Sequence, residues 1–290
     1  MLIPDKQRKR MNNTYVLDAE DPAEVARLLD QDRILTESMG GLFSEQSDLA
    51  EVVEVLDIGC GPGGWVHEVA RSYPAMEVTG VDISRTMIDY ARAHARVRKI
   101  PNAHFQVMNA LEFPLAFPAA SFDLVNIRML TGVVPPRLWN SLLAECRRLL
   151  RPEGVVRLSE AEWGFTNMPG LETFCALMNQ AIQLELHSFS PTGRHLGVTP
   201  MMKLFLRRAG FQHIGQKAHV LDYSAGSQAH GGVADDYKLL MQLSRPLFLR
   251  TRVASQEELD ALYEQVMDEL QEEDCCALSF ILTVWGRAPL

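Results

Sequence analysis

Short apolar runs alternate with longer amphipathic segments through the first half of the chain. Apolar runs bounded by turn residues predict strands that are buried on both faces of a sheet. They lie at residues 51–59, 75–82, 102–110, 121–130 and 155–163. Between them, apolar residues recur with helical spacing at 63–74, 85–99 and 135–154. We expect Ser84 to cap the second of these helices and Gly154 to end the third. The alternation predicts a parallel sheet with right-handed crossovers and helices on both faces.

From about residue 163 the helical pattern dominates. Helices are predicted at 170–189, 198–210, 233–250 and 255–273, and two late strands at 211–224 and 275–289. Thr199 before Pro200 predicts the cap of one helix, and Ser255 with Glu258 has the spacing of a capping box. No internal repeat or low-complexity linker interrupts the chain. We therefore expect one domain whose sheet is completed by the two late strands.

The composition narrows the classes of partner. The 290 residues are 47% hydrophobic and carry a formal net charge of −9, so we expect neither nucleic acid nor an anionic membrane as partner. The basic cluster at 6–10 is interpreted as a solvated tail. No apolar run reaches the roughly 20 residues that span a bilayer, and the first residues lack the apolar region of a secretory signal. Five cysteines in no zinc-binding spacing predict reduced thiols, no metal site and a cytoplasmic location.

The glycine-rich turn "VLDIGCGPGG", residues 55–64, is the strongest candidate for a ligand site. A phosphate-binding P-loop requires Lys and Ser or Thr after its last glycine, but Trp65 and Val66 stand there. The letters of the dinucleotide fingerprint G-x-G-x-x-G are present. Asp82, which closes the second strand, stands where an acid would hold ribose hydroxyls. These features alone leave a dinucleotide and an adenosyl ligand without phosphate open.

Asp57, two residues before the first glycine, favours the adenosyl ligand over the dinucleotide. Its charge would repel a pyrophosphate but would suit a cation such as the ammonium group of an amino acid. With "VTGVDIS", "NALEFPLAFPAASFDLV" and "LLRPEG", in this order over roughly residues 50 to 160, the turn resembles the successive motifs of class I S-adenosylmethionine-dependent methyltransferases. The final "LTVWGRAP" resembles the end of many such chains. The resemblance implies a Rossmann-like α/β fold, with a seven-stranded, mostly parallel sheet, an antiparallel last strand and helical lid insertions.

The resemblance implies S-adenosylmethionine as cofactor and assigns residues to it. The turn matches the loop under the methionine part, Asp82 the ribose acid, and Ile83 the apolar side chain on the adenine. Asn109 stands where the family often has an Asp for the adenine amine, and Arg128 is a candidate partner for the cofactor carboxylate. The N-terminal segment resembles one that closes over the cofactor through a Tyr. The predicted cofactor-binding residues are Tyr15, Gln31, Asp57, Gly59, Cys60, Gly61, Gly63, Asp82, Ile83, Met87, Asn109, Ala110, Leu111, Asn126 and Arg128.

The resemblance also divides the chain into three parts. We expect an N-terminal helical cap at 1–48 and an S-adenosylmethionine-binding core at 49–162. Residues 163–290 are expected to form a helical lid and the last two strands of the same domain. The loop "ELHSFSPTGRHLG" supplies His195, Arg194 and His187 as candidate catalytic residues near the substrate.

The predicted reaction is the in-line transfer of a methyl group to a small, partly apolar molecule, giving S-adenosylhomocysteine. The sequence leaves oxygen, nitrogen and carbon acceptors open, and a homodimer too. Two alternatives remain. A nicotinamide-dependent oxidoreductase would be expected to carry a polar set such as Tyr-x-x-x-Lys after the fourth strand, where "NIRMLTGVV" offers none. A non-catalytic protein that keeps the cofactor pocket would show the same motifs.

Overall fold

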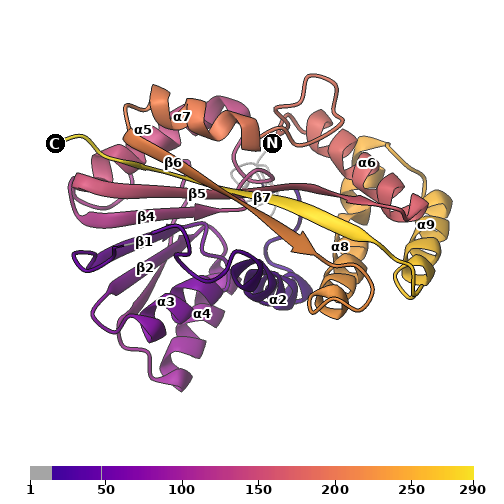
Figure 1. The fold of residues 1–290 in the computed structure, drawn as a ribbon, viewed down its shortest axis with the longest axis horizontal. Coiled ribbons are helices and arrows are strands. Elements are labelled where there is room, and N and C mark those ends of the chain that lie inside the picture. The colour runs from indigo at the N-terminus through magenta and orange to yellow at the C-terminus, as the bar shows by residue number, and fades with distance from the viewer. Residues whose placement is uncertain (1–14, 47) are drawn as a thin grey trace, which may run out of the picture.

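The computed structural model describes residues 15–46 and 48–290, so the basic cluster at 6–10 lies outside the described residues. Within this part of the chain, seven strands form one sheet in the order β3-β2-β1-β4-β5-β7-β6 (Figure 1). The strands are β1 (Glu54–Ile58), β2 (Glu77–Asp82), β3 (Ala103–Val107), β4 (Phe122–Arg128), β5 (Leu150–Thr166), β6 (Gln212–Asp222) and β7 (Ala277–Arg287). Strands β1 to β5 pair in parallel, whereas β7 is antiparallel to both β5 and β6. The predicted sheet is confirmed.

Helices pack on both faces of the sheet. They are α2 (Pro22–Ser38), α3 (Gly64–Ser72), α4 (Arg85–Arg98), α5 (Trp139–Leu149), α6 (Pro169–Leu184), α7 (Met202–Arg208), α8 (His230–Thr251) and α9 (Gln256–Glu269), with short 3-10 helices η1 (Pro136–Leu138) and η2 (Thr199–Met201). Successive side chains of a strand point to opposite faces. Val55 accordingly packs into the apolar cluster of α3 and α4, and Leu56 packs into that of α5 and α7.

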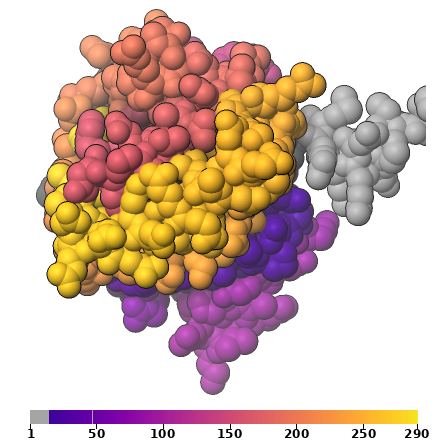
Figure 2. Space-filling model, turned by 90° about the vertical axis from the view of Figure 1, so that its right-hand side faces the viewer, coloured from indigo at the N-terminus to yellow at the C-terminus, as the bar shows by residue number. Residues whose placement is uncertain are grey.

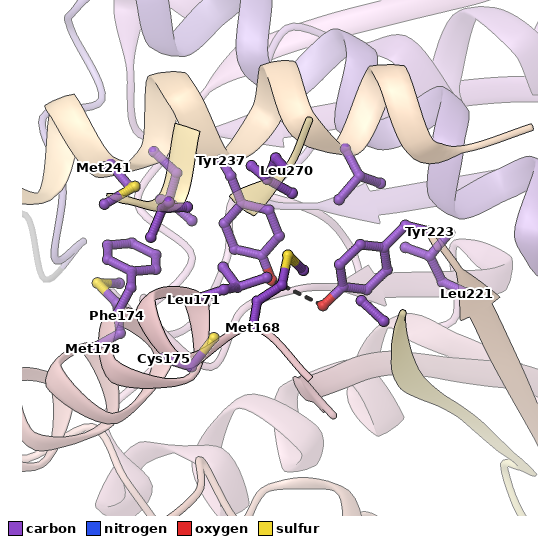
Figure 3. Packing of buried hydrophobic residues seen from close by; sticks show 14 of the residues in the cluster. Met168, Leu171, Phe174, Cys175, Met178, Leu221, Tyr223, Tyr237, Met241 and Leu270 are labelled. Carbon is purple, nitrogen blue, oxygen red and sulfur yellow. Dashed lines mark hydrogen bonds between the residues drawn. The ribbon is translucent and has the colours of Figure 1, made fainter. Parts of the chain in front are cut away.

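The third apolar cluster lies beyond the carboxyl end of β5. Helices α6, α8 and α9 pack on one another there, and α2 packs along α8 (Figure 1). Figure 2 shows this helical layer from its outer side, with α2 in indigo beside the yellow and orange helices of the C-terminal part. Phe174 of α6 contacts Tyr237 of α8 edge to face (Figure 3). It contacts Phe248 of α8 in the same way. Among the described residues, no helix combines the length and the apolar character needed to cross a membrane.

Most local signals are confirmed, with two corrections. The side chain of Ser84 accepts from the backbone N–H of Met87, and the capping box at the start of α9 is complete. The helix predicted to end at Gly154 ends at Leu149, because Leu150 is already extended and pairs with β4. Thr199 does not cap a helix. Its Oγ1 donates to Glu162 Oε1 (3.0 Å), and Thr199 is itself the first residue of the 3-10 helix η2.

Candidate active site

The turn between β1 and α3 requires glycine for steric reasons. Gly59, Gly61 and Gly63 have φ values of +73°, +51° and +83°, in the left-handed region that side chains disfavour. A Cβ on Gly63 would also lie 2.6 Å from Phe105 Cε1. The backbone N–H groups of Gly59 and Cys60 donate to the carbonyl of Val81, so the turn lies close against the carboxyl end of β2.

Asp82 is held in place by this turn. Its Oδ2 accepts from the backbone N–H of Gly61 (2.9 Å), and its Oδ1 accepts from the backbone N–H of Ser84 (2.8 Å). Burial raises the pKa of Asp82, while these hydrogen bonds act in the opposite direction. An ionised carboxylate has about four acceptor positions, so Asp82 can still accept hydrogen bonds from a ligand.

Asp57 belongs to a buried polar row across three strands. Asp57, Asn126 and Arg157 are direct neighbours in the registers of β1, β4 and β5, and so lie on the same face of the sheet. Asn126 Nδ2 donates to Asp57 Oδ1 (2.7 Å), and Arg157 Nη1 donates to Asn126 Oδ1 (2.8 Å). The row ends at Glu45, which accepts from Arg157 Nε at 2.5 Å.

Burial and the row together set the charge of Asp57. Its pKa is raised to about 7, because the rise caused by burial and by the neighbouring Asp82 exceeds the opposing effects of Asn126 and Arg157. Near neutral pH this carboxyl is therefore poised between its two protonation states. A nearby cation would favour the ionised form.

The predicted cofactor-binding residues surround one cavity, which we call the first cavity. All of them line it except Gly63, which lies in the turn behind it, and Asn126, which is buried and holds Asp57. Tyr15 and Gln31 reach the cavity from the N-terminal part of the chain. The roles of these residues toward a cofactor stay predictions.

Beside the predicted Gln31, helix α2 contributes Leu28, Asp32 and Leu35, which the sequence interpretation missed. These residues line the first cavity at the spacing of one helix face, which is a signal the sequence already contained. Asp32 forms a salt bridge with Arg128, whose Nη1 also donates to Thr36 Oγ1 (3.0 Å). Burial lowers the pKa of Arg128 to about 9. Arg128, the predicted partner of a cofactor carboxylate, is thus already paired with side chains of α2.

A second cavity adjoins the first. Tyr15, Gln31, Leu35 and Met129 line both. Met129 follows β4 with a φ of +54°, a strained conformation for a residue with a side chain. The second cavity extends between the carboxyl end of β5 and helices α2, α6 and α8.

Aromatic and carboxylic side chains line the second cavity. The hydroxyls of Tyr223 and Tyr237 lie 3.4 Å apart, and burial raises the pKa of Tyr223 to about 12, so both stay protonated (Figure 3). Glu160, Glu162 and Asp236 line the same cavity. Its wall thus combines a large apolar surface with a few polar groups, as small-molecule sites do.

A buried ion cluster fixes the N-terminal part to α8. Tyr15 Oη donates to Glu24 Oε1 (2.5 Å), and Arg27 pairs with Glu24 through Nε (2.7 Å) and Nη2 (2.8 Å). Arg27 Nη1 also donates to Asp236 of α8 (2.9 Å). The cluster holds α2 and Tyr15 over both cavities.

The candidate catalytic residues lie elsewhere. His187, Arg194 and His195 line neither cavity. The backbone carbonyl of Arg194 accepts from Asn179 Nδ2 (3.0 Å), and that of His195 accepts from Ser188 Oγ (3.2 Å). His187 is buried, which lowers its pKa. The loop is anchored by Glu162, a contact that the sequence pattern does not reveal.

Among residues 15–46 and 48–290, no cluster of His, Cys, Asp and Glu could hold a metal ion.

Residues 55–154 match the family model described as a methyltransferase domain. This stretch, which runs from β1 through the glycine turn into β5, is thus similar to methyltransferase domains. It is 28% identical to methyltransferase str2 of Strobilurus tenacellus over 59% of both chains. It is 30% identical to the probable methyltransferase ltbC of Aspergillus luteorubrus over 61% of this chain and 62% of the relative. The chain thus spans about three fifths of the length of these two curated relatives.

A solved structure supports the fold. Phosphoethanolamine N-methyltransferase 2 of Haemonchus contortus, in complex with S-adenosyl-L-methionine, superposes with a TM-score of 0.53 at 19% identity. The match covers 89% of this chain and 53% of that one. At this identity the likeness concerns the arrangement of strands and helices.

Proposed function

We propose that this chain transfers the methyl group of S-adenosylmethionine to a small, partly apolar molecule in the second cavity. The observation that carries the proposal is the junction of the two cavities, which share Tyr15, Gln31, Leu35 and Met129. A cofactor in the first cavity and an acceptor in the second would meet at these residues. Methyl transfer requires such contact, because the acceptor atom must lie in line with the breaking bond.

The residues of the first cavity fit the chemistry of this cofactor. Asp57 offers a buried carboxylate to an ammonium group, and Asp82 offers free acceptor positions to ribose hydroxyls. The side chains of Ile83, Met87 and Leu111 supply apolar surface for an adenine ring. When bound, the cofactor supplies an electrophilic methyl group on a sulfonium. The protein positions the acceptor and excludes water around it, and positioning alone can contribute up to about 7–11 kcal/mol in favourable cases.

The division of labour along the chain follows from this proposal. Residues 49–162 hold the cofactor, the cap at 1–48 closes one wall of both cavities through α2, and 163–290 enclose the acceptor. The contacts of α2 with α8 and the α6 and α8 residues of the second cavity support these roles. A cytoplasmic location accords with the five unpaired cysteines.

Calorimetric titration tests the proposal. We expect saturable binding of S-adenosylmethionine and S-adenosylhomocysteine and no heat from NAD under the same conditions. Binding of NAD alone would instead assign the turn to a dinucleotide. Binding of the adenosyl ligands with no methyl transfer to any small molecule would favour a non-catalytic, cofactor-binding protein.

A further inference from the structure

Glu160 lies at the boundary of the two cavities. Glu160 belongs to β5, lines the second cavity and is 1% exposed. Its Oε1 accepts from the backbone N–H of Leu130 (2.8 Å), a residue of the first cavity. Its Oε2 accepts from Thr131 Oγ1 (2.7 Å), a residue of the second. The carboxyl group is therefore fixed beside the place where cofactor and acceptor would meet.

Glu160 keeps capacity to accept hydrogen bonds, whereas the neighbouring Glu162 does not. A carboxylate has about four acceptor positions. Glu162 uses four: its oxygens accept from the N–H groups of residues 196, 197 and 199 and from Thr199 Oγ1. Asp236 is paired with Arg27. Glu160 accepts from Leu130 and from Thr131, and its carboxylate has acceptor capacity left for a ligand.

The surroundings of Glu160 make it a base near neutral pH. Burial raises its pKa to about 7, and the charge of Glu162 adds to the rise. The hydrogen bonds from Leu130 and Thr131 act in the opposite direction. General bases are most effective when their pKa lies near the working pH.

The rest of the second cavity favours an acceptor with an aromatic body. The oxygens of Glu162 already accept four hydrogen bonds, and Asp236 is paired with Arg27, which Glu24 shares. The rings of Trp163, Tyr223 and Tyr237 line the wall. Trp163 Nε1 is buried and, among the described residues, has no hydrogen-bond acceptor. A ligand with an aromatic body and an oxygen atom would complement this wall.

We propose that Glu160 is the general base for methylation of a phenolic hydroxyl held in the second cavity. This inference rests on the proposed function. The phenol O–H proton passes to the Glu160 carboxylate as the phenol oxygen bonds to the methyl carbon. The carbon–sulfur bond breaks and its electron pair stays on sulfur. The products are an aryl methyl ether, S-adenosylhomocysteine and protonated Glu160, which then returns its proton to solvent.

Binding tests the proposal without turnover. The probes are 2-naphthol and its methyl ether 2-methoxynaphthalene, titrated in the presence of S-adenosylhomocysteine at pH 8. A hydrogen bond to a charged acceptor corresponds to roughly a 10- to 100-fold preference for the naphthol. Glu160→Gln should reduce that preference to below about threefold. Glu172→Gln, which removes an exposed carboxyl that lines neither cavity, should retain it.

Turnover with S-adenosylmethionine supplies the second measurement. We expect 2-methoxynaphthalene as product, and a fall in kcat of roughly 10²- to 10⁴-fold in Glu160→Gln with the Kd for S-adenosylmethionine unchanged. Glu160→Asp should recover part of the rate, because it keeps a carboxylate. The unchanged cofactor Kd and the circular dichroism spectrum show that each variant is folded.

The outcomes separate the two levels of inference. A parent protein that binds no S-adenosylmethionine refutes the proposed function itself. A parent that binds the cofactor but prefers 2-naphthylamine or naphthalene-2-thiol, or binds none of the probes, refutes the phenolic acceptor. An equal naphthol preference and rate in Glu160→Gln refutes the role of Glu160.

Discussion

Replacing Arg157 with Met tests the buried polar row that joins Asp57 of the first cavity to Glu45. The side chains of Arg157 and Glu45 are both 0% exposed. Without the guanidinium, the carboxylate of Glu45 keeps a 3.4 Å contact from Gln46 Nε2 as its one hydrogen bond from the described residues, and Asn126 Oδ1 loses its donor. Stranding a buried charge costs about 3–5 kcal/mol. We expect Arg157→Met to lower the free energy of unfolding by about 4 kcal/mol at pH 7, measured by urea denaturation.

A double-mutant cycle provides the control. Adding Glu45→Gln to Arg157→Met removes the stranded charge, so the double variant should be about 2 kcal/mol more stable than Arg157→Met alone. If Arg157→Met stays within about 1 kcal/mol of the parent, or if the second change restores nothing, the row does not act as a compensated buried ion pair.

The same substitution makes a functional prediction. Arg157 opposes the rise in the pKa of Asp57, and Asp82 adds to it. Loss of the cation therefore raises the pKa of Asp57 above its present value of about 7 and leaves more of it neutral at pH 7. The Kd for S-adenosylmethionine should rise at pH 7 and recover toward the parent value at pH 8.5. Equal affinities at both pH values would argue against an ionised Asp57 as the ammonium partner.

Three further changes probe separate features. Asp82→Ala should weaken S-adenosylmethionine binding by roughly 10- to 100-fold in calorimetry, and an unchanged Kd would exclude it as the ribose acid. The folded-state pKa of Glu160 is raised to about 7, so its contribution to stability is lost as pH rises. From pH 5 to pH 8 the parent should lose about 2.5 kcal/mol relative to Glu160→Gln, whereas parallel stability curves would contradict the raised pKa. Gly63→Ala places its Cβ 2.6 Å from Phe105 at φ +83°, whereas Gly226 has φ +79° and no atom within 4 Å. In urea denaturation, Gly226→Ala should lower the free energy of unfolding by about 1 kcal/mol, and Gly63→Ala by at least about 2 kcal/mol more. Equal decreases in the two variants would refute the packing argument.

Local signals were enough for the core of the fold. The strand at Glu54–Ile58, the glycine turn and the acid at Asp82 lie within 30 residues, and their interactions are set by the βαβ geometry they share. The cap of α4 at Ser84 and the capping box of α9 depend on residues three positions apart. Such features need no knowledge of distant elements. The incorrect cap prediction at Thr199 shows the limit of local signals. Its hydroxyl donates to Glu162, which is distant in the sequence.

The sequence by itself determined the strands and the residues of the glycine turn, because strand hydrophobicity and turn geometry act over short stretches of chain. Only the tertiary structure decided how the site is enclosed. Asp32 of α2 meets Arg128 of β4, and Arg27 meets Asp236 across an interval of 209 residues. Glu160 gains its raised pKa from burial beside a cavity whose wall comes from α2, α6 and α8. Burial and pairing depend on which surfaces meet, and these meetings are fixed by packing rather than by local pattern.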